Sequence, residues 1–399
     1  MGIAIIGAGI TKFGELWDKN WEDLVIESSK EASENANIDL TEIDSCYVGN
    51  MNLSRFEGQD HVAPRINEIL GIKKVVRSEA ACASSSVALK LAFNELELSS
   101  IKNANKIILV VGFEKMTDRI TQNVTEILAS ASHYDTEVIN GATFPGLYAL
   151  LASRYLYETD ANENDLHAVA IKNHKNAVLN EKAMFRKEIN LEDFKIDVAT
   201  PLKLLDCSPI SDGSASLILT TEEYAKQLDV EYVKLECVEI ATNTISLAKR
   251  NDLLVLDSAK RASEEAYKKA KIRPEDIDVI ELHDCFTIAE ILNLEACGFA
   301  KRGEGYKIVR TLEPYDEINK KDAPIPYIIN GKKLFVNTSG GLKAKGHPVG
   351  ATGAAQIVEI VNQLLGRCGK RNVNCKIGAA LNIGGTGGSA AFSVLRRPW

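Results

Sequence analysis

The chain has 399 residues, of which 45% are hydrophobic and 26% charged, and its formal net charge at pH 7 is −8. This balance is typical of a globular protein with two or three domains, or with one large duplicated fold, and it excludes a disordered or fibrous chain. The acidic charge argues against a nucleic-acid-binding protein, while local patches can still bind an anionic ligand.

The cysteines and the chain ends indicate a reducing compartment. The eight cysteines show neither C-x-x-C pairs nor regular spacing, so the sequence predicts neither a zinc site nor a disulfide framework. The N-terminus lacks the pattern of a signal peptide, no stretch is apolar enough to span a membrane, and the ending RRPW is not a peroxisomal address. We therefore expect a soluble cytoplasmic protein that binds neither membranes nor nucleic acids.

The first glycines occur in IIGAGITKFG. Gly7, Gly9 and Gly14 do not match the G-x-G-x-x-G dinucleotide fingerprint. The run favours a strand followed by a glycine-permitted turn.

Short apolar runs then alternate with helical patterns along the chain. Buried strands are predicted at residues 106–113, 215–221, 233–241, 277–284 and 377–385. Helices are predicted near residues 21–36, 82–98, 257–271 and 349–366. This alternation indicates an α/β fold whose sheets are covered on both faces.

The two ends of the chain repeat one pattern. A small-residue helix precedes the strand KIILVVGF in the first half, and KGHPVGATGAAQIVEIVNQLL precedes IGAALNIGG in the second. The long polar stretch between the halves predicts an inserted subdomain. Its basic residues suggest either a solvated surface or a phosphate-binding edge: Lys172, Lys175, Lys182, Arg186 and Lys187.

Cys82 stands in EAACASSS, just ahead of a predicted helix. A free cysteine is often a buried apolar residue. A helix N-terminus can instead stabilise its thiolate and make it a nucleophile.

Three further segments combine reactive side chains with strand ends or glycines: ELHDCFT (281–287), GGLKAKGHPVGATGAA (340–355) and ALNIGGTGG (380–388). His347 lies in a glycine-rich turn and is the better candidate for the base of Cys82. His283 and Cys285 are two residues apart and would share one face of a strand. Each residue could separately be structural, but all four together point to catalysis.

These segments resemble, in order, the four active-site segments of the thiolases: EAACASSS, ELHDCF, VNTSGGLKAKGHPVGATGA and NIGGTGG. The His-Asp-Cys-Phe form is similar to sterol-carrier-protein-type thiolases and archaeal acetyl-CoA acetyltransferases. The resemblance implies two duplicated βαβαβαββ halves in αβαβα layers. It divides the chain into an N-terminal half (1–116 and 206–230), an inserted loop domain (117–205) and a C-terminal half (231–399).

The resemblance also implies a role for each site residue. Cys82 would be the nucleophile, His347 its base and an oxyanion donor, Cys285 the acid/base, and His283 a second oxyanion donor. Backbone N–H groups of Cys82 and Gly384 would hold the acyl oxyanion. Asn382 replaces the second cysteine of the commoner enzymes, and an amide cannot act as a base.

The implied reaction condenses two acetyl-CoA molecules to acetoacetyl-CoA, with CoA thioesters as substrates and neither cofactor nor metal. Ser208 and Phe286 would contact CoA. The resemblance also suggests a homodimer or homotetramer, a small zinc-ribbon/OB-fold partner, and 3-hydroxy-3-methylglutaryl-CoA synthase of the mevalonate route as a further partner. The alternatives are a β-ketoacyl synthase, a thiolase-like aldolase, and an inactive lipid-transfer or scaffold subunit.

Overall fold

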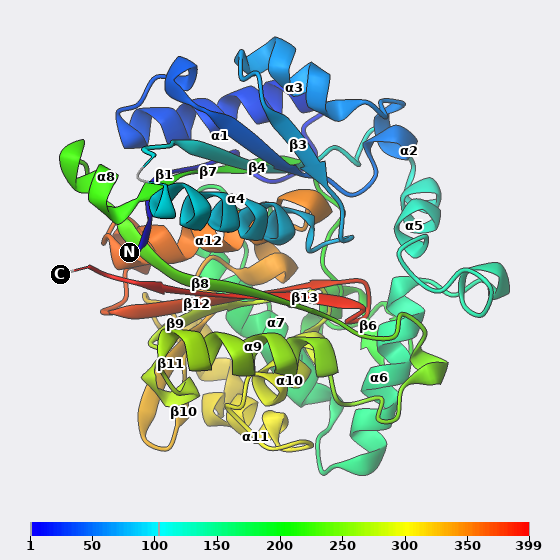
Figure 1. Ribbon diagram of the computed structural model, residues 1–399. Helices are drawn as coiled ribbons and strands as arrows, with labels where there is room; N and C mark the ends of the chain where they lie inside the picture. Colours follow the sequence, from blue (N-terminus) through cyan, green and yellow to red (C-terminus); the bar gives the residue numbers. More distant parts are fainter. Residues whose placement is uncertain (1, 103, 399) are drawn as a thin grey trace.

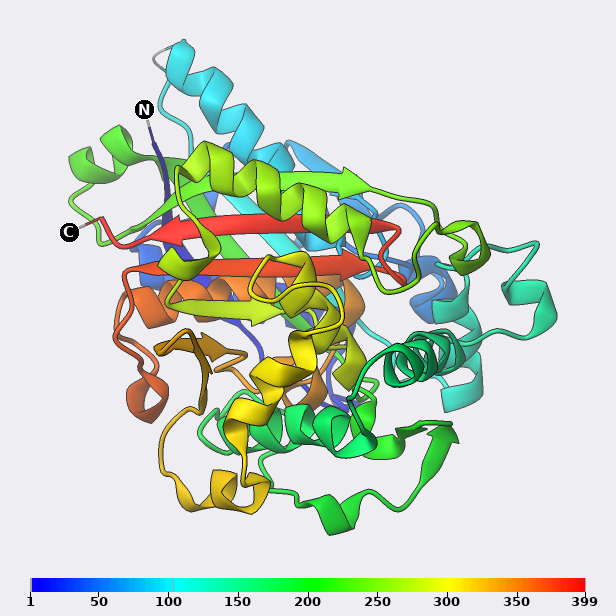
Figure 2. The same cartoon turned by 90° about the horizontal axis from the view of Figure 1, so that it is seen from below.

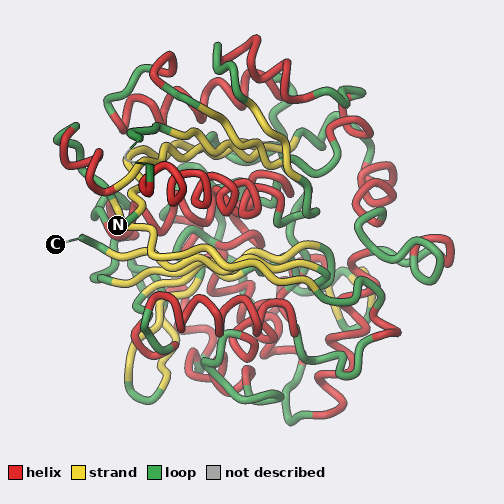
Figure 3. The backbone as a smooth tube through the Cα atoms, viewed as in Figure 1, coloured by secondary structure: helices red, strands yellow, loops and turns green. Residues whose placement is uncertain are grey.

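Layers of strands and helices alternate through the molecule (Figures 1 and 3). The computed structural model describes residues 2–102 and 104–398. In Figure 1, helices α1 (Trp21–Ala36) and α3 (Val62–Leu70) cover an upper sheet. Helices α4 (Ser84–Ile101) and α12 (Thr352–Leu364) separate it from a lower sheet, which α9 (Asp257–Ala270) and α10 (Thr287–Ala296) cover from below. The thiolase-like α/β layering expected from the sequence is confirmed.

Each half of the chain builds five strands in one spatial order. In the first half the order is β1-β7-β4-β2-β3, formed by Ile3–Ile10, Gly213–Thr221, Ile108–Glu114, Ser45–Gly49 and Val75–Ser78. In the second it is β8-β13-β12-β9-β11, formed by Val233–Thr242, Ser389–Arg396, Ile377–Gly384, Val279–Leu282 and Lys332–Val336, and β10 (Pro326–Ile329) extends the far edge. Equivalent pairs share the same parallel or antiparallel sense, so the duplication is confirmed.

The two sheets meet edge to edge. Residues 3–5 of β1 pair antiparallel with residues 233–235 of β8, which joins the described strands of both halves into one hydrogen-bonded order. Figure 2 shows α9 lying over the strands of the second half, roughly along their direction. The five strands and four helices predicted from periodicity are all present, with shifts of a few residues at their ends.

The central helices carry the site because both begin next to it. Nearly every residue of α12 is buried, as expected for a helix with a sheet on either side. Helix α4 begins two residues after Cys82, and α12 begins five residues after His347. The small residues of EAACASSS and GATGAA allow this close packing.

The segment between β4 and β7 packs into the second half. It contains α5 (Thr121–Ala129), α6 (Phe144–Glu158), α7 (Glu163–Val178) and a small hairpin of β5 (Asp197–Ala199) and β6 (Leu202–Lys203). Helices α6 and α7 share one apolar core with β9, α9 and α10.

The remaining short helices are α2 (Leu53–Glu57), α8 (Glu222–Gln227) and α11 (Gly305–Val309). None of the helices in the described ranges is long and apolar enough to cross a membrane.

The strand predicted at the first glycines is confirmed as β1, but Gly7 and Gly9 do not form the turn after it. Gly7 and Gly9 lie inside β1 rather than after it. A Cβ on Gly7 would stand 2.3 Å from the Ala32 carbonyl oxygen, and one on Gly9 would stand 2.2 Å from that of Ser28. These glycines therefore let α1 lie directly on the strand.

The two lysines of α7, Lys172 and Lys175, are buried. Both predictions for them, a solvated surface and a phosphate-binding edge, are therefore wrong. The Lys172 ammonium is fully buried and donates to Glu290 at 2.7 Å. Lys175 is also buried and donates to Glu188 at 2.6 Å. Because a buried charge needs a partner, these cations tie α7 to its neighbours instead of binding phosphate.

Candidate active site

Cys82 lies in the tight turn between β3 and α4. The preceding Ala81 has a φ of +51°, a conformation that non-glycine residues seldom adopt. The hydroxyl of Ser84 holds the turn: it donates to the Ala81 carbonyl at 2.6 Å and accepts from the Ala80 N–H at 3.0 Å. The nucleophile predicted from the sequence is therefore held at the N-terminus of α4.

The pKa of the Cys82 thiol is determined mainly by burial and not by the N-terminus of the helix. Burial raises the pKa of the Cys82 thiol to about 12, and the Gly385 N–H opposes this effect by donating to the sulfur. Cys82 is thus a neutral thiol at pH 7, and the effect of the helix N-terminus does not produce a thiolate. The N–H at the sulfur belongs to Gly385, one residue after Gly384, whose role as an oxyanion donor stays a prediction.

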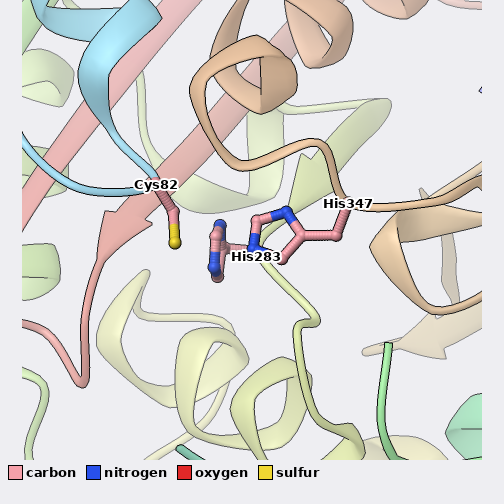
Figure 4. Close-up of side chains that lie close together, drawn as sticks. All are labelled: Cys82, His283 and His347. Carbon is pink, nitrogen blue, oxygen red and sulfur yellow. The ribbon is translucent and has the colours of Figure 1, made fainter. Parts of the chain in front are cut away.

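Cys82, His283 and His347 converge from three segments (Figure 4). One ligand atom of each lies within 4.8 Å of the others. The two imidazole rings stand edge to face with centroids 5.1 Å apart. The structure therefore gathers these three predicted residues into one buried cluster.

Hydrogen bonds indicate the tautomer of His347. Its Nδ1 lies 2.7 Å from the Thr352 hydroxyl, which itself donates to the Pro348 carbonyl at 3.1 Å. Because that hydroxyl has one proton, it accepts from Nδ1–H, which leaves the Nε2 lone pair free. Burial, followed by the Lys345 charge, lowers the pKa of His347 to about 3, so the ring is neutral and can accept a proton.

The opposite tautomer is indicated for His283. Asn382 places its Nδ2 3.1 Å from His283 Nδ1, while its Oδ1 accepts from the Ser86 hydroxyl at 3.0 Å. The amide is thereby oriented to donate to Nδ1, so the proton of the neutral ring lies on Nε2. That Nε2 is buried and has no partner among the described residues. It is therefore a buried donor whose hydrogen bond is not used by the described residues.

A cysteine and two histidines are also a donor set for zinc. A metal needs a lone pair from each ring, whereas the Asn382 bond places a proton on the free nitrogen of His283. The arrangement therefore suits a developing negative charge better than a cation.

Cys285 lies three residues after the end of β9 and is also buried. Burial raises the pKa of its thiol well above the usual value. A hydrogen bond from Tyr148 to the thiolate form opposes this effect, and the nearby Cys82 adds to it. The two sulfurs are thus close enough to interact electrostatically. The role of Cys285 as the acid/base stays a prediction.

Two buried carboxylates brace the loop of His347. Asp284 accepts from the N–H groups of Leu342 and Lys343 at 2.7 and 3.2 Å, and Glu114 accepts from Gly350 N–H at 3.1 Å. The Ser211 hydroxyl accepts from the His347 N–H at 2.7 Å. The loop is therefore fixed from both halves of the fold.

Ser208 and Phe286 adjoin the Cys285 turn. The Ser208 N–H donates to the Cys285 carbonyl at 2.9 Å, and Cys207 forms a β-bridge with Phe286. Phe286 is buried and stacks on Tyr148 with ring centroids 4.6 Å apart. The proposed contacts of both residues with CoA stay predictions.

Sequence reasoning missed three residues that act on the cluster: Tyr148, Ser211 and Thr352. Thr352 lies in the GHPVGATG motif, so its hydroxyl five residues after His347 could have been noticed. Ser211 and Tyr148 lie where no local pattern marks them, because each meets the site only through the fold.

Comparison with known proteins identifies the family of this chain. The family profile "Thiolase, N-terminal domain" matches residues 3–201, and "Thiolase C-terminal domain-like" matches residues 240–397. The chain is 40% identical to an acetyl-CoA acetyltransferase of Methanothermobacter thermautotrophicus, with 99% of each chain covered. It is 43% identical to an acetyl-CoA acetyltransferase of Methanocaldococcus jannaschii, with 98% of each covered.

Among solved structures, the fold superposes on a chain of the "Ltp2-ChsH2(DUF35) aldolase" with a TM-score of 0.81, at 20% identity, covering 100% of this chain and 98% of that one. The layered duplicated fold and the Cys–His–His cluster define a thioester-condensing class of enzyme. The chain belongs to the thiolase family.

Proposed function

We propose that this chain is an acetyl-CoA C-acetyltransferase that converts two acetyl-CoA molecules to acetoacetyl-CoA and CoA. One observation carries the proposal: a thiol, a histidine acceptor and a histidine donor converge within 4.8 Å, beside a second buried thiol. The names of the two relatives described above support acetyl-CoA as the substrate.

The first half-reaction acetylates Cys82. The free Nε2 of His347 takes the thiol proton while the sulfur attacks the thioester carbonyl, so no thiolate need exist beforehand. The departing CoA thiolate takes a proton from Cys285. This leaves an acetyl-cysteine, a protonated His347 and a Cys285 thiolate, with protons and charge balanced.

The second half-reaction forms the carbon–carbon bond. The Cys285 thiolate removes an α-proton from the second acetyl-CoA. Nε2–H of His283 and of the protonated His347 then both donate to the enolate oxygen. The enolate attacks acetyl-Cys82, and the released Cys82 sulfur recovers its proton from His347.

The test is mass spectrometry of the intact chain after incubation with acetyl-CoA alone. We expect an acetyl group on Cys82 and acetoacetyl-CoA in solution. A requirement for an acyl carrier protein would favour a β-ketoacyl synthase. An unmodified Cys82 under every condition would favour a lipid-transfer or scaffold subunit, and cleavage of a hydroxyacyl-CoA without acetylation would favour an aldolase.

We also propose that the chain forms a homodimer or homotetramer. Strand β3 ends the sheet order, so its outer edge is unpaired within the described residues, and its Val76 side chain is 40% exposed. Such an edge favours pairing with a second copy. Sedimentation of the purified protein tests this proposal, and a monomer at all concentrations would refute it.

Because condensation is energetically uphill, an enzyme that consumes acetoacetyl-CoA would draw it forward. We propose 3-hydroxy-3-methylglutaryl-CoA synthase in the cytoplasm, within the mevalonate route, together with a small zinc-ribbon/OB-fold protein. The name of the Ltp2-ChsH2(DUF35) aldolase joins a second component to the chain that this fold resembles, which supports a protein partner. Co-purification from the source cells tests the assembly, and recovery of the homo-oligomer alone would contradict it.

A further inference from the structure

Tyr148 of helix α6 reaches the catalytic cluster from the inserted segment. Its side chain is among the largest that are fully buried, and its ring stacks on Phe286 with an interplanar angle of 26°. Phe286 directly follows Cys285 in the chain. The stacking therefore holds the phenol beside the thiol that we propose as the base.

The hydroxyl of Tyr148 has two acceptors and one proton. It donates to the Gly385 carbonyl at 3.1 Å. The ring stacking on Phe286, the residue after Cys285, places the same hydroxyl near the Cys285 sulfur, and a hydrogen bond from it to the thiolate lowers the pKa of that thiol. A phenol O–H can rotate between two such acceptors, and an anionic sulfur is a stronger acceptor than a peptide carbonyl.

Gly385 links this hydroxyl to the nucleophile. Its N–H donates to the Cys82 sulfur, while its carbonyl accepts from Tyr148. Burial raises the pKa of the Tyr148 phenol well above its usual value, and the Arg250 charge opposes that effect. The phenol thus keeps its proton at neutral pH and acts only as a donor.

A thiolate at Cys285 needs a donor because its surroundings are buried. The titratable and charged groups whose charges act on Cys285 and Tyr148 are Cys82, Asp284 and Arg250. Cys82 and Asp284 cannot stabilise an anion by their charge, the Arg250 charge acts on Tyr148, and the Phe286 N–H is a backbone donor to the sulfur. The Tyr148 hydroxyl is therefore the side-chain donor in position to do so.

We propose that Tyr148 is a switched donor to the catalytic base: its hydroxyl bonds the Gly385 carbonyl while Cys285 is a thiol and turns onto the sulfur when Cys285 becomes a thiolate. The inference rests on the proposed role of Cys285 as the base. The phenol transfers no proton. It rotates once when Cys285 loses its proton to the departing CoA, and returns when the sulfur takes the α-proton of acetyl-CoA.

The test compares two steps in Tyr148→Phe, which keeps the stacked ring and removes the hydroxyl. Stoichiometric acetylation of Cys82 is followed by mass spectrometry after rapid quenching. Removal of the α-proton is followed by NMR, as deuterium entering the methyl group of acetyl-CoA in D₂O. We expect exchange and condensation to fall about 10- to 100-fold, the range for losing a hydrogen bond to a charged group, with a much smaller fall in acetylation.

Tyr155→Phe is the matched control. Tyr155 lies on the same helix and is equally buried, but its hydroxyl donates to Glu295 at 2.6 Å. This variant should lose stability and keep the wild-type ratio of exchange to acetylation. A merely structural role of Tyr148 would give the same unchanged ratio in Tyr148→Phe.

Two outcomes separate this inference from the proposed function. If Cys285→Ala abolishes exchange while Tyr148→Phe exchanges at the wild-type ratio, the switched donor is refuted and the base assignment stands. If Cys285→Ala itself exchanges normally, Cys285 is not the base and both proposals fail together.

Discussion

Replacing Cys285 with alanine should separate the two half-reactions. The thiol is 6% exposed, follows strand β9, and interacts electrostatically with Cys82. Removing one sulfur atom from this buried place costs about 1–2 kcal/mol of stability, which a folded protein of this size tolerates. The Tyr148 hydroxyl keeps the Gly385 carbonyl as an acceptor, so no buried donor is left unpaired.

The kinetic effect should be much larger on condensation than on acetylation. A positioned base contributes roughly 10²- to 10⁴-fold, or about 3–5 kcal/mol of the barrier, to removal of the α-proton. A CoA thiolate can leave without a proton donor, because thiols ionise near pH 8.5. Acetylation of Cys82 therefore persists, slowed about tenfold at most.

The assay is a rapid-quench measurement on the variant mixed with acetyl-CoA. We expect one equivalent of CoA released in a burst, an acetyl group on Cys82, and little acetoacetyl-CoA. Cys46→Ala is the control, because Cys46 is a buried thiol in the core of the first sheet. Wild-type formation of acetoacetyl-CoA by Cys285→Ala would refute the assignment of the base.

Three further expectations follow from the geometry. Thr352→Val removes the hydroxyl that accepts from His347 Nδ1–H, so acetylation of Cys82 should slow about 10- to 100-fold in rapid-quench experiments. Because the pKa of Cys82 is raised to about 12, its thiolate fraction increases with pH, and alkylation by iodoacetamide should accelerate about tenfold per unit between pH 6 and 9. Lys172→Met leaves Glu290 as an unpaired buried charge, so urea unfolding should report a loss of about 3–5 kcal/mol with KM for CoA unchanged.

Each expectation has a control and a contradicting result. Thr220→Val loses a hydroxyl that donates to the Lys106 carbonyl and should acetylate Cys82 at the wild-type rate. If this control slowed acetylation as much as Thr352→Val, the proposed effect of the Thr352 hydroxyl on the His347 tautomer would be refuted. An alkylation rate that is already constant above pH 7 would mean a preformed thiolate. Lys187→Met, at an exposed position, should leave stability unchanged. A stable Lys172→Met with a raised KM would restore the phosphate-binding interpretation.

Local patterns were sufficient for five of the strands and four of the helices. Strands such as β4 and helices such as α1 are encoded by the spacing of apolar residues, which depends only on neighbours in the sequence. The duplicated order of strands followed from the repeated pattern. Cys82, His283, Cys285 and His347 are predicted because the segments that contain them resemble the active-site segments of the thiolases.

Tertiary structure alone decided how those residues can work. The proton on His283 depends on Asn382 and Ser86, which are 296 positions apart in the chain. The same holds for Lys172, whose burial depends on Glu290, and for Tyr148, which meets Cys285 only when the inserted helix packs on the second half. The spacing of apolar residues predicts which face of a helix or strand is buried. The hydrogen-bond partner of a side chain and the shift of its pKa depend instead on atoms from distant parts of the sequence that the fold places next to that side chain.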